Sequence, residues 1–362
     1  MPRVKLKVLV ICGGKSAERD VSLTSASAIL RNLDQAKYDI RVVVIDANGR
    51  WTLPGDLRRA GLTWSGPGSP GKRAVSLAPE KSLALSLPGI PGFSPPDVVL
   101  PVLHGPNGED GTVQGLLELA NVAYVGCGVL GSAIAMDKEF PKRIAPGEGV
   151  DILPYAVIRT KDAGTDYDFL IKRLGLPLFV KPSRMGSSVG VSKVGKKSEL
   201  IPALRLAGKF DDKIVLEKGI DAREIEVAVL GDSVSAEASV CGEIRVDKGF
   251  YDYETKYRDP AAAKLIIPAE IPARTARKAR DWAVRMFHAL EGYGMSRVDF
   301  LLDKKTGRLY YNETNTIPGF TEISLYPRMW EASGLPFPKL LDRLLALALL
   351  RHRRKSAFKT KR

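Results

Sequence analysis

The sequence holds one loop of small residues that suits phosphate oxygens, KPSRMGSSVG at residues 181–190. Glycine and serine let successive backbone N–H groups turn toward one point, and such a nest binds anions. Lys181, at the end of the preceding apolar run, adds a positive charge. The alternative is a hairpin loop that is flexible only because of its composition. The run lacks the G-x-x-x-x-G-K-[ST] spacing of a Walker A loop, so that kind of nucleotide site is not predicted.

Three side chains with oxygen atoms flank a turn at residues 304–307: Asp299, Glu313 and Asn315. Side chains alternate across a strand, so Asp299 lies on the face opposite its apolar neighbours, and Glu313 shares a face with Asn315. If the two strands pair as a hairpin, the three side chains converge. Two carboxylates and an amide suit Mg²⁺, which is bound together with substrate phosphates. A solvated hairpin face is the alternative.

Charged and aromatic side chains in further loops could meet a ligand. The loop YDYETKY at 251–257 could be a lid that excludes water, or an exposed polar turn. Glu18, after the first apolar run, could meet a cationic group or cap a helix. His104 stands beside a glycine-rich loop, whereas His288 lies in a predicted helix and is expected to be structural. No Ser–His–Asp or Cys–His pattern stands out. These features imply ATP, Mg²⁺ and a ligand with an amine, but they do not name a reaction.

A sheet must bring these loops together, and the apolar pattern predicts one. Buried strands are expected at Val4–Cys12, Ile40–Ile45 and Val98–Leu103, with helices at 22–33 and 113–120 between or after them. Strands that alternate with helices predict an open parallel sheet of the α/β class. Ligands bind at the carboxyl ends of the strands in such sheets.

The rest of the chain shows a second pattern of shorter strands. An amphipathic helix is expected at Arg274–Glu291, and a last helix at Leu340–Leu350. The segment 64–96 is rich in Pro, Gly and Ser and is expected to be a long loop. Further strands are expected at 178–181, 191–194, 214–218 and 224–230, and a hairpin at 298–302 and 309–311.

Composition limits the class of protein. The chain has 362 residues, 44% hydrophobic and 27% charged, which is typical of a soluble protein of two or three domains. Its formal net charge of +14 would fit a nucleic-acid partner, an anionic membrane surface or phosphate chemistry. Half of that excess lies at 351–362, where seven basic residues and no acidic one predict a disordered tail. No other stretch clusters basic with aromatic residues, so a nucleic-acid partner is not expected.

The cysteines and the apolar runs bear on location. Cys12, Cys127 and Cys241 are too few and too scattered for a disulfide framework or a zinc knuckle, which favours a reducing cytoplasm. The run at 4–12 is short and has no cleavage site, so a buried strand is expected rather than a signal peptide. The apolar stretch at 77–103 is broken by charges and prolines, so no membrane span is expected.

The motifs together resemble those of the D-alanine–D-alanine ligases, which are of the ATP-grasp class. The resemblance covers about residues 4–350, with the motifs in the family's order. It implies a mixed α/β fold with an N-terminal parallel domain and two domains that sandwich ATP. The resembling motifs are GGKSAERDVSL, HGPNGEDGTVQGLLEL, MDKEFPK, KPSRMGSSVGVSKV, LEKGIDAREIEVAVLG, FYDYETKY, SRVDFLLD and YYNETNTIPGFTEISLYP.

The resemblance also implies a reaction and its ligands. ATP phosphorylates the carboxylate of one D-alanine, and the amine of a second D-alanine then displaces phosphate, for peptidoglycan precursor synthesis. Two Mg²⁺ ions take part, and Mn²⁺ can replace them. By motif position, the residues for the nucleotide are Lys138, Lys181, Lys256 and Ser188 at the phosphates, Glu217 and Lys218 at adenine, and Glu224 at the ribose; Asp299, Glu313 and Asn315 hold the metal ions.

The same comparison implies the residues that meet the amino acids. Glu18 receives the first ammonium, in a hydrogen-bonded trio with Ser187 and Tyr257. The oxyanion is stabilised by Arg297 and the backbone N–H of Gly319. The remaining substrate residues are His104 near the first D-alanine, and Ser324 with Leu325 at the carboxylate of the second.

The resemblance leaves some matters as expectations. The domains are expected at 1–136, 137–218 and 219–350, followed by the tail at 351–362, and a homodimer is expected. A tyrosine at 257 favours an amine as the second substrate. A related ligase that takes D-lactate or D-serine second is the alternative. Met185, where many members have Glu, is among the modest departures, and none of these removes a catalytic side chain.

Overall fold

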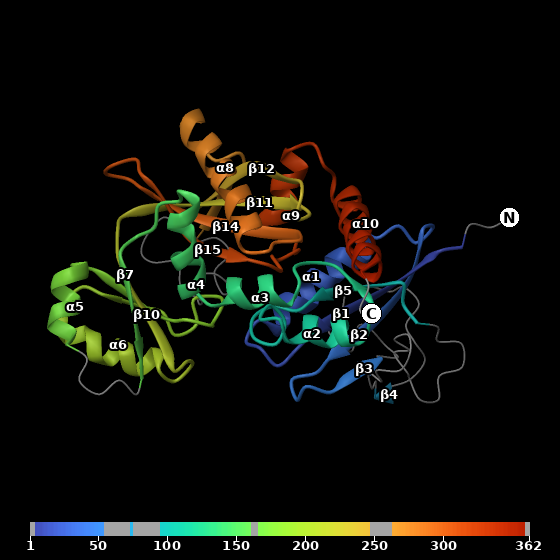
Figure 1. Cartoon of the computed structure of the whole chain (residues 1–362), viewed down its shortest axis with the longest axis horizontal. Helices are drawn as coiled ribbons and strands as arrows, with labels where there is room; N and C mark the ends of the chain where they lie inside the picture. Colours follow the sequence, from blue (N-terminus) through green and yellow to red (C-terminus); the bar gives the residue numbers. More distant parts are fainter. Residues whose placement is uncertain (1–3, 54–72, 75–94, 161–165, 247–262, 359–362) are drawn as a thin grey trace.

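The computed structural model describes residues 4–53, 73–74, 95–160, 166–246 and 263–358 (Figure 1). The expected lid at 251–257, with Lys256 and Tyr257, lies outside the described residues, as does nearly all of the expected loop at 64–96. The described part contains three β-sheets.

The first sheet is the predicted parallel α/β sheet. Its strand order is β4-β3-β2-β1-β5-β6, and β1 pairs in parallel with β2 and β5. Leu9 of β1 belongs to the core that includes α2, and Val10 belongs to the core that includes α1, so helices cover both faces. The elements are β1 (Leu6–Gly13), α1 (Arg19–Asn32), β2 (Tyr38–Ile45), β3 (Trp51–Leu53), β4 (Arg73–Ala74), β5 (Val98–Val102), α2 (Thr112–Leu119) and β6 (Ala123–Tyr124).

The second sheet is antiparallel, with the order β7-β10-β8-β9. Helices α5 and α6 pack on it around a small core of their own, at the left of Figure 1. Its elements are β7 (Tyr155–Arg159), α5 (Tyr167–Leu174), β8 (Leu178–Pro182), β9 (Ser192–Val194), α6 (Leu200–Ala207) and β10 (Lys213–Lys218).

The third sheet has the order β13-β12-β11-β14-β15 and is also antiparallel. One face packs on α8, the predicted amphipathic helix, which buries Trp282 and Met286. The other face packs on α9 and α10. The elements are β11 (Ala222–Gly231), β12 (Ala236–Val246), β13 (Ala263–Ile266), α8 (Ala273–Ala289), β14 (Gly294–Asp303), β15 (Leu309–Asn315), α9 (Leu325–Ala332) and α10 (Phe337–Ser356).

The first and third sheets share one apolar core. Val10 and Val44 of the first sheet lie in the same cluster as Ala228 of β11 and Leu341 of α10. The segment between these sheets and the second one consists of α3 (Val129–Met136), α4 (Glu139–Ile144) and a 3₁₀ turn at Ala145–Glu148. Among the described residues, the structure has no helix long and apolar enough to cross a membrane.

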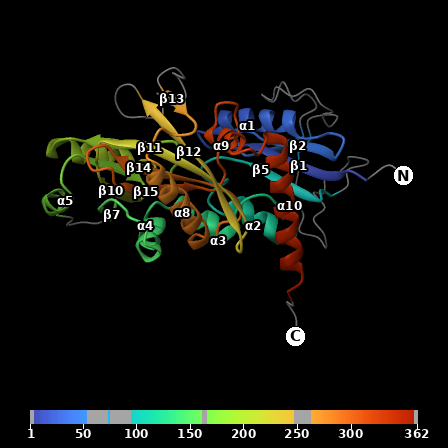
Figure 2. The ribbon, with the colours of Figure 1, turned by 90° about the horizontal axis from the view of Figure 1, so that it is seen from above.

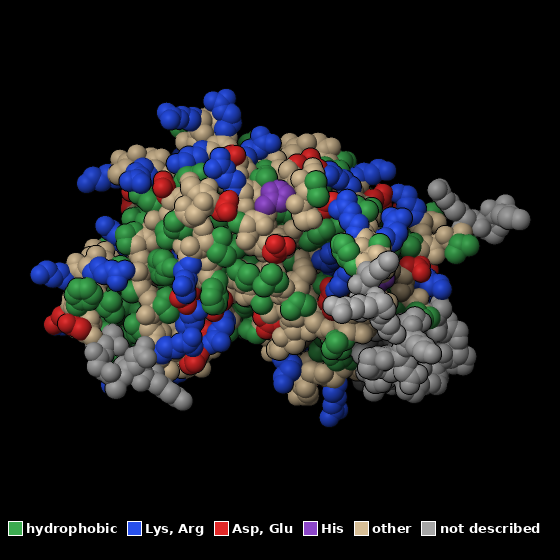
Figure 3. All heavy atoms as spheres, viewed as in Figure 1, with side chains coloured by type: hydrophobic (Ala, Val, Ile, Leu, Met, Phe, Trp, Pro, Cys, Tyr) green, Lys and Arg blue, Asp and Glu red, His purple; other side chains and the backbone are tan. Residues whose placement is uncertain are grey.

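The structure corrects the expectation of a disordered tail for residues 351–358, and the rest of the expected tail, 359–362, lies outside the described residues. Helix α10 continues to Ser356, beside the strands of the first sheet (Figure 2). Arg351 donates to the carbonyls of Gly126 and Tyr124, at 2.6 and 3.0 Å, and its guanidinium stacks 4.0 Å from the Tyr124 ring centroid. Arg354 pairs with Asp232 at 2.8 Å. The basic residues here are ordered because they have partners. On the face in Figure 3, Lys and Arg are spread among acidic side chains.

Gly13 provides a test of how tightly the first strand is connected to β2. Its φ is +90°, and a Cβ there would lie 2.2 Å from the carbonyl oxygen of Ile45. We expect Gly13→Ala to lower the free energy of unfolding by about 1–3 kcal/mol, measured by urea denaturation. Gly147→Ala is the control, because a Cβ there meets no described atom within 4 Å, and it should change stability by less than about 0.5 kcal/mol. Equal effects would contradict the strain argument.

Candidate active site

The centre of the site is a buried carboxylate between two lysines. Glu217 of β10 is 1% exposed and accepts from Lys142 of α4 and from Lys181 of β8, the latter at 2.6 Å. In the register of β8 and β10, Lys181 is opposite Val215, so Glu217 is its diagonal neighbour on the same face. Lys142 also donates to the backbone oxygen of Asn312 on β15, at 3.1 Å. The cluster therefore joins the second and third sheets.

The cluster holds two amines and one carboxylate, and burial and charge shift the pKa of each group. Burial alone would raise the pKa of the Glu217 carboxyl, but the charges of the two lysines outweigh it and hold that pKa below its usual range. Burial opposes the charge of Lys181, yet the nearby Glu217 carboxylate raises the pKa of that lysine overall. Burial is the stronger effect at Lys142, whose pKa is lowered. Glu217 and Lys181 are therefore charged at neutral pH.

The glycine/serine loop, residues 185–190, follows β8 and lies beside this cluster. Ser187 and Ser188 have φ values of 49° and 57°, a left-handed conformation that non-glycine residues seldom adopt. Such strain is concentrated at functional sites. The ammonium of Lys138 donates to the carbonyl of Met185 at 2.6 Å. The loop and Lys138 thus form one wall of the site, which we name the phosphate-binding wall because its arrangement fits phosphate oxygens.

The loop also reaches the first sheet. The Ser187 hydroxyl donates to the carboxylate of Glu18, which directly precedes α1. A Cβ at Gly186 would lie 2.8 Å from a carboxylate oxygen of Glu18, so the backbone approaches closely. The structure brings together two of the three residues of the expected trio, and the third, Tyr257, lies outside the described residues.

Arg297 stands among carboxylates on the third sheet. Its guanidinium donates to both oxygens of Asp299, at 2.8 and 2.6 Å, and lies 2.9 Å from Glu226 of β11. Burial opposes its charge, but Asp299 and Glu226 raise the pKa of Arg297 well above its ordinary value. The guanidinium is therefore a permanent cation at this face.

The expected metal ligands share that face. Asp299 is opposite Glu313 in the register of β14 and β15, and Arg297 is opposite Asn315. The Glu313 carboxylate also lies 3.5 Å from the ammonium of Lys138. Within the described ranges, no group of three or more His, Cys, Asp or Glu is placed to hold a metal ion. The donor set of two carboxylates and one amide nevertheless fits Mg²⁺, since it offers hard oxygen atoms close to the phosphate-binding wall.

His104 lies at the end of β5 and is buried. Its Nδ1 is 2.9 Å from the carbonyl oxygen of Ile317, and its Nε2 is 3.4 Å from the hydroxyl of Ser25. The Glu109 carboxylate lies 3.9 Å from Nδ1. Burial lowers the pKa of His104, but the combined effects of Glu109 and Glu18 outweigh burial and raise it overall. His104 therefore connects the first sheet to the loop after β15.

The remaining predicted residues lie near the start of α9 or on the strands. Ser324 is the residue before α9, and its hydroxyl is 2.7 Å from that of Thr321. A Cβ at Gly319 would lie 2.7 Å from the Ser324 hydroxyl, so this backbone is close to it. The Leu325 side chain is buried in the shared core, which leaves only its backbone for a ligand. Lys218 is exposed at the end of β10, and Glu224 lies on β11, between β12 and β14.

Three buried residues of the site were not assigned from the sequence. Lys142 lies in the motif MDKEFPK, and its spacing gave no sign that it would pair with Glu217. Glu226 lies on β11 beside Arg297. Glu109 lies in the glycine-rich loop after β5 and accepts from the backbone N–H of Gly105 at 2.8 Å. The strand alternation of 224–230 could have indicated Glu226 from its apolar neighbours.

Comparison with known proteins identifies the family. Residues 7–127 match the family model described as "D-ala D-ala ligase N-terminus", and residues 144–346 match "D-ala D-ala ligase C-terminus". The chain is 47% identical to a D-alanine–D-alanine ligase of Thermoanaerobacter sp. strain X514, over 97% of this chain and 98% of that protein.

Solved structures agree with this match. A D-alanine-D-alanine ligase from Coxiella burnetii superposes with a TM-score of 0.83 at 36% identity, covering 97% of this chain and 96% of that one. The VanG D-Ala:D-Ser ligase from Enterococcus faecalis also has a TM-score of 0.83, at 34% identity, covering 95% of this chain and all of the other.

The buried cluster predicts a large effect of one substitution. Glu217→Gln keeps the shape of the side chain but leaves two buried amines without their carboxylate. We expect the free energy of unfolding at pH 7 to fall by about 3–5 kcal/mol, measured by urea denaturation. The matched control is Glu237→Gln, since Glu237 pairs with Arg343 at a half-exposed site. This substitution should lower the free energy of unfolding by at most about 1 kcal/mol. Similar losses in the two variants would contradict the role of the cluster.

The lowered pKa of Glu217 also predicts a pH dependence. A carboxyl whose pKa is lower in the folded protein stabilises it above the ordinary value, here 4.5, and loses that contribution as pH falls toward the folded pKa. We expect the difference in unfolding free energy between the wild type and Glu217→Gln to be constant from about pH 7 to pH 5.5 and to narrow below about pH 4.5. A difference that stays constant at acid pH would refute this.

Proposed function

This chain belongs to the D-alanine–D-alanine ligase family, with its ATP-grasp fold, and on that premise we propose how its residues divide the work of joining two D-alanines. ATP phosphorylates the carboxylate of the first D-alanine, which gives ADP and D-alanyl phosphate. The amine of the second D-alanine then attacks the acyl carbon, and the tetrahedral intermediate expels phosphate.

The observation that carries the proposal is the contact between Ser187 and Glu18. It places a carboxylate of the first sheet against the loop that faces phosphate oxygens. An amino acid whose ammonium is held by Glu18 has its own carboxylate within the same space as the γ-phosphate of ATP. The substrate is thus held by one charge at each end. Its carboxylate and the γ-phosphate, both anions, are then already in place for the reaction, so the entropic cost of bringing them together is lower.

The amines near the loop counter the repulsion between these two anions. Lys138 and Lys181 hold the phosphates in this proposal, with Ser188 of the loop and Lys256 from the segment 251–257. Glu217 and Lys218 contact adenine and Glu224 the ribose. Because the Glu217 carboxylate is bound by lysines, its adenine contact is assigned to the backbone.

Asp299, Glu313 and Asn315 would hold Mg²⁺. When bound, the ions offset charge on the phosphate oxygens, and Mn²⁺ is a substitute of similar chemistry. The chain's own residues supply the other electrostatic contribution. Arg297 and the backbone N–H of Gly319 donate to the oxyanion of the tetrahedral intermediate, and fixed donors of this kind stabilise developing charge strongly.

The second D-alanine is placed by the start of α9 in this proposal. Ser324 and the backbone at Leu325 receive its carboxylate, and His104 lies near the first D-alanine. Tyr257 completes the trio with Glu18 and Ser187. We propose the domains 1–136, 137–218 and 219–350, a homodimer, and a place in the cytoplasm, where the product serves peptidoglycan synthesis and cell shape.

The second candidate is a ligase that accepts D-serine or D-lactate as the second substrate. The likeness to the solved protein named a D-Ala:D-Ser ligase favours it, and the overall fold does not separate the two. The likeness to a curated D-alanine–D-alanine ligase of Thermoanaerobacter, 47% identical over nearly the full length, favours D-alanine, since the solved D-Ala:D-Ser ligase is 34% identical. D-Alanine is therefore the preferred second substrate.

The test is an ADP-release assay with the purified full chain. We expect ADP and phosphate to appear only when D-alanine, ATP and Mg²⁺ are all present, and EDTA to abolish release until excess Mg²⁺ is added. Mass spectrometry should find D-alanyl-D-alanine. A panel of L-alanine, D-serine and D-lactate, run in competition with D-alanine across pH, serves as the control. If another amino or hydroxy acid stimulates ATP turnover and D-alanine does not, the substrate assignment is wrong.

A further inference from the structure

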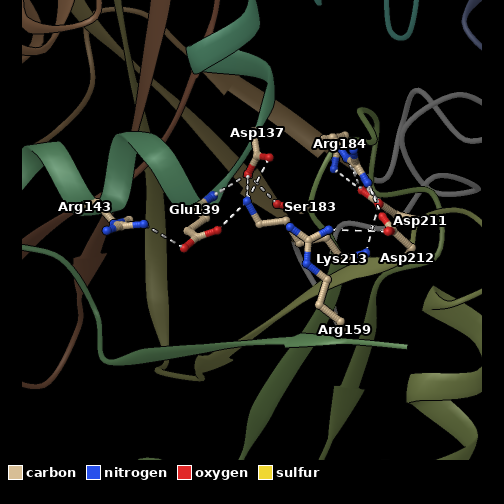
Figure 4. A network of polar contacts seen from close by, with 9 residues as sticks. All are labelled: Asp137, Glu139, Arg143, Arg159, Ser183, Arg184, Asp211, Asp212 and Lys213. Atoms are coloured by element: carbon tan, nitrogen blue, oxygen red, sulfur yellow. Dashed lines mark hydrogen bonds and ion pairs between the residues drawn. The ribbon is translucent and has the colours of Figure 1, made fainter. Parts of the chain in front are cut away.

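Another buried lysine, Lys213, lies in a network of polar contacts next to the phosphate-binding wall (Figure 4). It begins β10 and is 3% exposed. Its ammonium lies 2.9 Å from both carboxylate oxygens of Asp137 and also pairs with Glu139. The ring of Phe140 covers it, with its centroid 4.5 Å away. These partners all belong to the segment from the end of α3 to α4.

Through Asp137, this lysine is connected by hydrogen bonds to Ser183 and, through Ser183, to Lys138 of the phosphate-binding wall. The Ser183 hydroxyl donates to Asp137 at 2.7 Å, and the backbone N–H of Ser183 donates to the carbonyl of Lys213 at 2.9 Å. The backbone N–H of Lys138 donates to the carbonyl of Ser183 at 3.0 Å. The side chain of Lys138 then ends on the carbonyl of Met185. Lys138 is therefore attached at both ends to residues that enter the glycine/serine loop.

A neighbouring group of charges holds Arg184, the residue directly before that loop. The backbone N–H of Arg184 donates to Asp211 at 2.7 Å, and its guanidinium binds both Asp211 and Asp212. Asp211 also accepts from the backbone N–H of Lys213 at 3.0 Å. Arg159 of β7 approaches Asp212 at 3.4 Å. Figure 4 shows the two groups side by side, with Ser183 and Lys213 between them.

A buried ammonium is costly to desolvate, and a pair of apolar side chains of similar size would often stabilise a core as well. An ion pair with fixed hydrogen bonds instead holds its two side chains in one relative position. We propose that Lys213 is a positioning residue: by holding Asp137 against Ser183, it fixes Lys138 and the start of the glycine/serine loop as one unit, so that the nucleotide phosphates meet a preformed site. The inference rests on the proposed function, because the phosphate role of Lys138 comes from it.

The test compares Lys213→Met with Lys213→Arg in the full chain. Lys213→Met should raise the KM for ATP, and the Kd for ADP measured by calorimetry with Mg²⁺, on the order of 10²-fold, the effect of displacing a binding group by about 1 Å. The KM for D-alanine should change by less than about threefold. Lys213→Arg, which keeps the charge, should recover part of the nucleotide affinity. A purely structural role would lower thermal stability without this selective change.

A surface pair of the same sheet region supplies the matched control. Lys197 pairs with Asp168 at 2.6 Å, and both side chains are about two-thirds exposed. Lys197→Met removes the same group by the same substitution and should leave both KM values unchanged. If it weakens nucleotide binding as much as Lys213→Met does, the effect is one of general charge and the proposal fails.

Two more variants separate the possible failures. Ser183→Ala removes only the hydroxyl that binds Asp137, so it tests the same connection if Lys213→Met does not fold; it should raise the Kd for ADP about tenfold, and an unchanged Kd overturns the proposal. Lys138→Ala tests the phosphate role itself. If Lys138→Ala weakens nucleotide binding while Lys213→Met and Ser183→Ala do not, the positioning role is wrong and the proposed function stands. If Lys138→Ala has no effect on nucleotide binding, the phosphate role in the proposed function is wrong.

Discussion

Burying a charged amine is costly unless a carboxylate is buried with it, and this constraint organises the region where the second sheet meets the rest of the molecule. Lys142 and Lys181 enclose Glu217, and Lys213 is enclosed by Asp137 and Glu139. Because each pair joins residues from different elements, the charges can be neutralised only when those elements are in place. The polar contacts therefore specify the relative position of α4, β8 and β10 more than they add to stability.

The glycine/serine loop depends on that arrangement. Its left-handed serines are strained, and strain persists only where the surroundings determine the conformation. Those surroundings are Lys138 on one side and Glu18 on the other. The loop thus contacts Lys138, one of the amines proposed for the phosphates, and Glu18, the carboxylate proposed to receive an ammonium.

Much of this could be predicted from the sequence, for reasons that are local. Strand alternation places Asp299, Glu313 and Asn315 on one face, and the register of β14 and β15 agrees with it. The parallel sheet and helix α8 follow from apolar periodicity.

The burial of Lys142 could not be predicted, because its partner Glu217 is 75 residues away and a lysine on a helix ordinarily points to solvent. The helical start of the expected tail could not be predicted for the same reason, since Arg351 finds its carbonyl partners more than 220 residues earlier. Strand β12 was missed because its polar alternation resembles a loop.

The shared core of the first and third sheets has a thermodynamic consequence. Val10, Ala228 and Leu341 come from the two ends of the chain and its middle, so unfolding either sheet exposes the apolar surface of both. The second sheet differs: within the part of the chain that the structure describes, the core under α5 and α6 draws its members only from residues 156–216. Parts of a protein that share a core tend to unfold together, and parts with separate cores can open with different free energies. The molecule therefore consists of one large cooperative unit and one small one, and the lysines and the loop proposed for the nucleotide phosphates lie where the two units meet.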